Sequence, residues 1–210
     1  MNLLHATTAL CLLSAAPAFA GSITIDFEQP SSFASIDQFY SGGTDSDGVT
    51  GTNLGVSFGL DDLALQNDVL GPYFSNAPSP IGVMAAVGPE TAMNVAEGFT
   101  DISFFYSSPD DVTAGVQVWS GLDGKGTLLA SFDLTKNSDP SGTANPYGTW
   151  TQLFSGSWGN IAHSVTFVNS VGSAGFDDIS ISTPVPEPTT ATLALLGFAG
   201  LVVYKRRTAK

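Results

Sequence analysis

Cysteine and histidine are scarce in this chain, and their scarcity excludes several kinds of active site. The single cysteine, Cys11, lies in an apolar N-terminal segment, so the rest of the chain has neither a disulfide nor thiol chemistry. Beyond that segment His163 is the only histidine. A Cys/His catalytic pair and a zinc site with several histidines therefore cannot form.

Basic residues are almost missing between Asp26 and Glu187. All 19 acidic residues lie in that span, against only two cations, Lys125 and Lys136, which gives it a formal charge of about −17. Such a surface repels nucleic acid and anionic lipid headgroups, and it favours solubility and divalent cations. We expect no nucleic-acid partner, and solubility alone is a sufficient reason for the acidity.

The N-terminus has the pattern of an export signal. Residues 3–16 are apolar or small, and Ala18-Phe19-Ala20 has the small-x-small form that signal peptidase cleaves. The first residues depart from the usual pattern because they contain no Lys or Arg. We predict a signal peptide over residues 1–20, removed after Ala20.

The C-terminus combines a stiff peptide, an apolar run and a cluster of cations. Pro186 and Pro188 hold the backbone around Glu187 extended. Residues 189–204 would span about 24 Å as a helix, against about 30 Å of bilayer hydrocarbon. Lys205, Arg206 and Arg207 follow, and such cations stay on the cytoplasmic side. The pattern predicts a marginal membrane anchor with the preceding domain outside.

Together these C-terminal elements resemble the PEP-CTERM sorting signal of bacteria with two membranes. The resemblance covers residues 184–210: the Pro186-Glu187-Pro188 motif, the apolar run with Gly197 and Gly200, and the basic tail. It implies recognition by an exosortase, a transpeptidase-like enzyme of the inner membrane, and transfer of the protein to the cell envelope or extracellular matrix. An ordinary C-terminal membrane anchor is the alternative.

Residues 21–183 have the pattern of one all-β domain. Apolar residues recur with period two between Gly, Pro, Asn, Asp and Ser, and no long amphipathic helix is evident. We predict an antiparallel β-sandwich or jelly roll, followed by a single C-terminal hydrophobic helix; a barrel is the alternative. The expected strands are residues 23–27, 55–58, 63–65, 81–87, 92–95, 99–106, 112–120, 127–132, 148–154, 164–169 and 176–182.

Carboxylates in the first and last strands suggest a structural calcium ion. Asp26-Phe27-Glu28 and Phe176-Asp177-Asp178 weakly resemble the terminal strands of jelly-roll carbohydrate-binding modules, which implies calcium ligated by Glu28, Asp177 and Asp178. Asp177 shares its face with Ile179 and Ile181, so its carboxylate needs a partner. Hydrogen bonds from a loop backbone would serve equally well. The segment Asp45-Ser46-Asp47-Gly48 is only part of a calcium loop, and we interpret it as a turn.

Aromatic side chains near loops are the candidates for ligand binding. Tyr147, Trp150 and Trp158 have the large amphipathic rings that stack on sugars. Trp119 follows a regular apolar alternation, which favours a place in the core. Because a strongly anionic polymer would be repelled, we expect a neutral polysaccharide or another surface component as the partner.

No pattern in the sequence points to catalysis. His163 is expected on one strand face with Ile161, Val165 and Phe167, as a hydrogen-bonded or edge residue of the core. A Ser-His-Asp triad stays open, but no Gly-x-Ser-x-Gly motif occurs, and no pair of carboxylates stands out for glycoside hydrolysis. We predict an exported envelope or exopolysaccharide-matrix protein without catalytic residues; an extracellular polysaccharide hydrolase is the alternative.

Overall fold

The computed structural model describes residues 21–67, 71–138, 147–156 and 158–184, which contain eleven β-strands and one short 3₁₀ helix. The strands are β1 (Ser22–Ile25), β2 (Val56–Ser57), β3 (Asp62–Gln66), β4 (Gly82–Ala86), β5 (Ala92–Phe99), β6 (Asp101–Ser107), β7 (Val112–Trp119), β8 (Leu128–Leu134), β9 (Thr151–Ser155), β10 (Ala162–Thr166) and β11 (Gly175–Ser182), and the helix η1 is Val168–Ser170.

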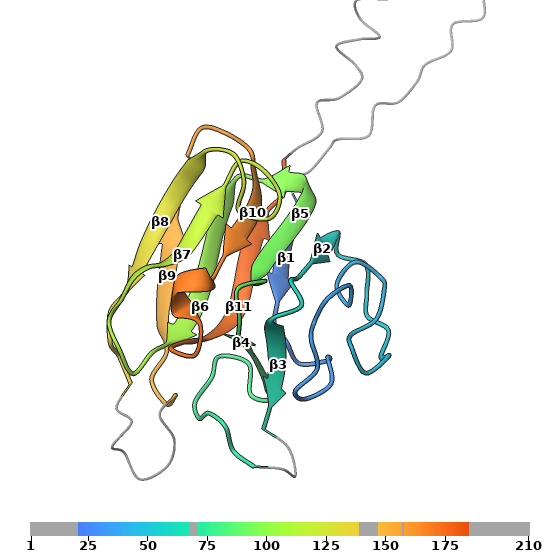
Figure 1. The fold of residues 1–210 in the computed structure, drawn as a ribbon, viewed down its shortest axis with the longest axis vertical. Helices are drawn as coiled ribbons and strands as arrows, with labels where there is room; N and C mark the ends of the chain where they lie inside the picture. Colours follow the sequence, from blue (N-terminus) through green and yellow to red (C-terminus); the bar gives the residue numbers. More distant parts are fainter. Residues whose placement is uncertain (1–20, 68–70, 139–146, 157, 185–210) are drawn as a thin grey trace, which may run out of the picture. The chain divides into compact units, whose positions relative to one another are not determined.

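The strands form two antiparallel sheets packed face to face. One sheet has the order β3-β4-β11-β6-β9, with β1 added beside β11, and the other has the order β2-β5-β10-β7-β8. From β4 to β11 the strands have the order of a jelly roll: the chain changes sheet at each step except between β7 and β8, which are neighbours in one sheet. Figure 1 shows this sandwich, with the long segment before β2 lying beside β2 and β3. The predicted sandwich is confirmed, and the barrel is excluded for the described residues.

The core lies between the sheets because alternate residues of the facing strands are apolar. Val116 and Val118 on β7, and Ile179 and Ile181 on β11, are no more than 1% exposed. Burying such a side chain stabilises the fold by about 1.5–3 kcal/mol relative to leaving it in water. The period-two pattern therefore predicted both the strands and the face that each strand buries.

Strand boundaries differ from the expectation where the chain bulges or turns. The expected strand 92–95 runs on to Phe99, and the next strand begins only at Asp101. Gly98, with φ of 77°, lies at this irregular point, and a Cβ there would meet Ile161 Cγ2 at 2.2 Å. Glycine therefore lets β5 continue past a close contact with the start of β10.

No helix among the described residues is long and apolar enough to cross a membrane. The predicted signal peptide and cleavage residues Ala18 and Ala20 lie outside the described residues. The same holds for the predicted C-terminal helix and for the sorting motif with its basic tail. Residues 21–184 form one compact unit by their internal contacts.

Candidate ligand-binding groove

A hollow of about 990 Å³ lies on the outer face of the sheet that contains β5, β7 and β10. Its floor consists of the side chains that alternate with core residues on these strands: Asn94, Ala96, Gln117, Trp119 and Thr166. Its walls are three connections, residues 57–60, 89–91 and 122–124. We call this hollow the β5–β7 groove. Its volume is in the range of known ligand sites.

Trp119 supplies the more exposed of the two aromatic rings that line the groove; the other, Phe58, is buried. Trp119 Nε1 donates a hydrogen bond of 3.1 Å to Thr166 Oγ1 on the neighbouring strand, and the side chain is half-buried. Because the indole N–H is already paired within the protein, the ring offers apolar surface rather than a free donor. Leu60 and Leu122, 58% and 45% exposed, add further apolar surface at the rim.

The wall beside Trp119 is a hairpin loop held against the sheet by polar contacts. Asn94 Nδ2 donates to Asp123 Oδ1 at 3.0 Å, and the backbone N–H of Asp123 donates to Asn94 Oδ1 at 2.8 Å. Gly124 N–H donates to Ser164 Oγ at 3.0 Å, which in turn donates to the Gly121 carbonyl at 2.6 Å. These reciprocal bonds fix the loop, so the wall is preformed.

The opposite wall is held by a buried carboxylate. Asp62, which is fully buried, accepts hydrogen bonds from the backbone N–H groups of Gly59 and Ala92, each at 3.0 Å, and from the Thr91 hydroxyl. Burial raises the pKa of Asp62 to about 7, although these hydrogen bonds favour the charged form. Asp62 thereby ties β3 to the two connections that contain Gly59 and Thr91.

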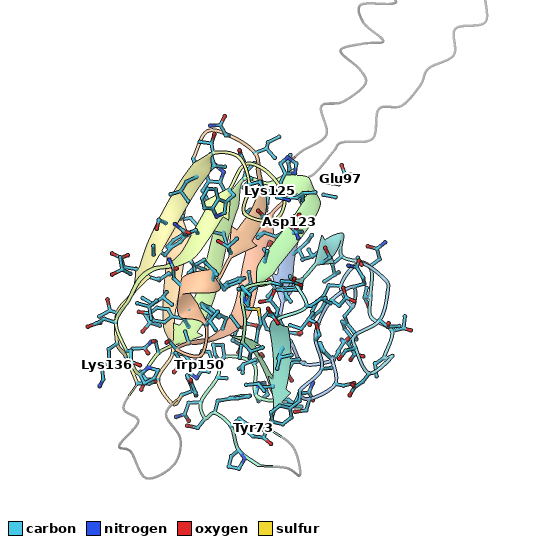
Figure 2. All side chains as sticks on the ribbon, viewed as in Figure 1. Tyr73, Glu97, Asp123, Lys125, Lys136 and Trp150 are labelled. Atoms are coloured by element: carbon cyan, nitrogen blue, oxygen red, sulfur yellow. The ribbon has the colours of Figure 1, made fainter. Side chains whose placement is uncertain are left out.

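Tyr147 and Trp150, two of the predicted ligand-binding residues, meet at a different place. They line a small apolar pocket of about 80 Å³ together with Tyr73, Phe74 and residues of β3, β4 and β11, three strands of the six-stranded sheet. Trp150 Nε1 donates to the Ser75 carbonyl at 3.0 Å, and its ring packs edge-on against Phe74. Figure 2 shows Tyr73 and Trp150 at the end of the sandwich opposite Asp123 and Lys125. Trp150 thus helps to fix the 71–80 loop.

Trp158, the third predicted residue, is not brought together with these two. Its ring packs edge-on against Phe99 with centroids 5.8 Å apart, and its Nε1 is buried without a hydrogen-bond partner. The structure therefore separates the three predicted rings into two places. Their role in binding stays a prediction.

The predicted calcium ligands lie where β11 changes partner. Residues 175 and 176 of β11 pair with β4, whereas residues 179–182 pair with β1 on the same edge. At the change, buried Asp177 accepts hydrogen bonds from Ser79 N–H at 2.8 Å and Ser79 Oγ at 2.6 Å. Burial raises its pKa to about 7. Glu28 Oε1 accepts the N–H groups of Ile81 and Gly82 at 2.8 Å each.

Backbone and hydroxyl donors thus satisfy the carboxylates of Glu28 and Asp177. Such hydrogen bonds were the alternative to calcium binding in the sequence analysis. Burial raises the pKa of Asp178, and Asp26 and Glu28 raise it further. Across the described ranges no group of three acidic, histidine or cysteine side chains is placed to hold a metal ion. Calcium binding by Glu28, Asp177 and Asp178 stays a prediction, which a melting temperature that rises with calcium would support.

Two expectations about individual residues need correction. Trp119 does not lie in the core: Val118 is buried, and the next residue points to the outer face. His163 does not share a core face with Ile161, which is 46% exposed, because the strand register shifts between Ala162 and Ser164. His163 is half-buried, with Nδ1 3.2 Å from the Val95 carbonyl oxygen.

The segment from Asp45 to Gly48 is a turn, as interpreted from the sequence. Asp45 accepts the backbone N–H groups of Ser31, Asp47 and Val49 at 2.8–3.0 Å. Burial opposes ionisation, but these donors hold the pKa of Asp45 below its usual range.

Sequence reasoning missed the groove because its residues come from six separate segments. One signal was present: in a period-two strand that buries Val116 and Val118, position 119 belongs to the opposite face. Strict application of that rule to residues 116–119 would have placed Trp119 on the outer surface.

Comparison with known proteins supplies no identity. No protein-family model matches the chain, and no curated protein sequence matches it. Among solved structures, a cleaved adhesin domain of Lys-gingipain has 17% identity over 77% of this chain and 99% of its own, with a TM-score of 0.46. Another cleaved adhesin domain of Lys-gingipain, from Porphyromonas gingivalis, has 15% identity over 78% and 99%, with a TM-score of 0.41.

A third structure, CsCBM6-3 from Clostridium stercorarium in complex with cellobiose, has 16% identity over 58% of this chain and 93% of its own, with a TM-score of 0.34. At this level of similarity none of the three indicates what the groove binds.

Proposed function

We propose that this protein is a non-catalytic binding protein whose β5–β7 groove holds a glycan, with Trp119 as the stacking ring. The supporting observation is the groove itself: one partly exposed indole on a floor of amide and hydroxyl side chains. A sugar ring has an apolar face and a rim of hydroxyl groups that donate and accept hydrogen bonds. Gln117, Ser57 and Gln38 offer both kinds of partner in this groove.

The distribution of perturbed carboxyl groups supports binding rather than cleavage. A glycosidase needs a protonated carboxylic acid that reaches the scissile bond. The two aspartates whose pKa is raised to about 7, Asp62 and Asp177, are both fully buried and engaged by protein donors. Asp62 is enclosed by the groove wall that it holds together, and Asp177 lies on β11 of the other sheet, so neither is placed to contact a ligand in the groove.

Export and sorting complete the proposal. The predicted signal peptide and the PEP-CTERM-like residues 184–210 would carry the sandwich through the inner membrane and, after processing by an exosortase, to the cell envelope or matrix. There the groove would hold exopolysaccharide.

Affinity electrophoresis of the full-length protein in gels containing neutral polysaccharides tests the groove. We expect retardation by at least one neutral polymer, and Trp119→Ala should weaken it by about fivefold to tenfold, as expected for the loss of one stacked ring. Strongly anionic polymers should retard the protein little.

The matched control is Trp150→Phe, which keeps an aromatic ring against Phe74 but removes the indole from the small pocket. It should leave retardation unchanged. If Trp150→Phe abolishes retardation and Trp119→Ala does not, the groove is not the site. Release of reducing ends would assign the protein to the hydrolases.

A further inference from the structure

The charges around the groove narrow the class of glycan. Glu90 and Asp123 line it from two different connections, residues 89–91 and 122–124. Glu90 is exposed, and Asp123 lies 3.4 Å from Lys125 Nζ with both side chains more than half exposed. No Lys or Arg is among the residues that line this groove. A ligand in the groove therefore meets carboxylates and an indole but no lining cation.

We propose that the groove prefers a cationic amino-sugar polymer, one with free ammonium groups, over a neutral or N-acetylated polymer of the same length. This inference rests on the proposed glycan-binding function of the groove. An ammonium group on a sugar ring that stacks on Trp119 would gain from the ring's quadrupole, as cations do over aromatic faces. Neighbouring ammonium groups would gain from Glu90 and Asp123.

Asp123 is placed to serve this role without movement of the backbone. Its Oδ1 accepts the hydrogen bond from Asn94, while its Oδ2 faces only the exposed Lys125 ammonium at 3.4 Å. An exposed ion pair of this kind contributes little to stability, so a ligand ammonium can replace Lys125 at small cost. The loop that carries Asp123 stays fixed through the Asn94 and Ser164 contacts.

The negative charge of the whole domain also favours binding of a cationic polymer, but it does not distinguish one polycation from another. A strongly acidic protein attracts any polycation at low salt. A specific site differs in two respects: binding depends on the ring at position 119, and each carboxylate of the groove contributes more than a carboxylate elsewhere on the domain. The test must therefore separate the groove from the general field.

Calorimetric titration of the full-length protein with glucosamine hexamers and N-acetylglucosamine hexamers makes this separation. At low salt we expect the glucosamine hexamer to bind about tenfold more tightly, and the ratio should decrease at about 0.15 M ionic strength. Trp119→Ala should weaken binding of both hexamers. Glu90→Gln and Asp123→Asn should each weaken only the glucosamine hexamer, by about twofold to fivefold.

Glu97→Gln is the matched control, because Glu97 is an exposed carboxylate on β5 that does not line the groove (Figure 2). It should change neither affinity. Equal affinity for the two hexamers, or an effect of Glu97→Gln as large as that of Glu90→Gln, would overturn the preference for amino sugars. If the two hexamers bind equally tightly but Trp119→Ala weakens both, glycan binding in the groove stands without the preference for amino sugars. Binding that Trp119→Ala does not change would reject both the preference and glycan binding in the groove.

Discussion

At the scale of single residues, Asp62 links the stability of the groove wall to pH. Its pKa is about 7 in the folded protein and close to 3.9 in an unfolded chain. Between these values the folded state binds more protons than the unfolded state, so the free energy of unfolding decreases as pH rises. The contribution is fully present below about pH 4 and is lost as pH rises through about 7.

Asp62→Asn should therefore remove much of this dependence. The amide oxygen can still accept the N–H groups of Gly59 and Ala92, and the amide nitrogen can donate to Thr91 Oγ1. Between pH 4 and pH 8 the wild-type free energy of unfolding should fall by up to about 4 kcal/mol more than that of the variant. Urea unfolding across this range measures the difference. Asp47→Asn, which replaces an exposed aspartate, is the control. Parallel curves for wild type and Asp62→Asn would contradict this role.

At the scale of elements, two connections of the groove wall are in direct backbone contact. Gly59 donates its N–H to the Ala92 carbonyl at 3.0 Å, and a Cβ on Gly59 would lie 1.9 Å from the Glu90 carbonyl oxygen. No side chain fits at this position. Gly59 is thus the residue that lets the 57–60 connection approach the 89–91 connection.

Gly59→Ala should separate these connections and destabilise the fold by about 1–3 kcal/mol, as overpacking does. Because both connections line the groove, glycan affinity should fall as well. Gly156→Ala is the control, since the nearest atom to its new methyl group would be Phe154 Cε1 at 3.9 Å. Thermal unfolding of the two variants measures the effect, and a Gly59→Ala protein as stable as the Gly156→Ala protein would refute the close approach.

The elements were predictable from the sequence to a greater extent than the site. The alternation in Ile102, Phe104 and Tyr106 predicted both a strand and its buried face, because burial repeats with period two. Asp177 was expected to share the inward face of Ile179 and Ile181, and this is wrong: it pairs with Phe105, whose neighbours Phe104 and Tyr106 face the core. The register of β11 shifts between Asp177 and Ser180, and Asp177 is buried against Ser79 instead. The sequence could not show that Glu90, Trp119 and Asp123 line one groove, because strand order determines their proximity and local pattern does not.

At the scale of the whole molecule, the account requires export and C-terminal processing. Replacing Glu187, or both Pro186 and Pro188, should leave unprocessed precursor in the inner membrane, because the stiff extended motif would no longer be recognised. Mass spectrometry of the protein from the cell envelope measures the outcome. A mature protein that retains residues 205–210 would show a simple anchor instead of a sorting signal.

The three tryptophans of the chain allow the central claim, glycan binding in the β5–β7 groove, to be tested in one measurement. Trp119 lies in the groove, Trp150 lines the small apolar pocket, and Trp158 packs against Phe99. Each indole N–H gives its own NMR signal in isotope-labelled full-length protein, and single Trp→Phe variants assign the signals. Titration with the oligosaccharide of a retarding polymer should move the Trp119 signal saturably and leave the Trp150 and Trp158 signals in place. A saturable shift of Trp150 or Trp158 with no change at Trp119 would contradict the account.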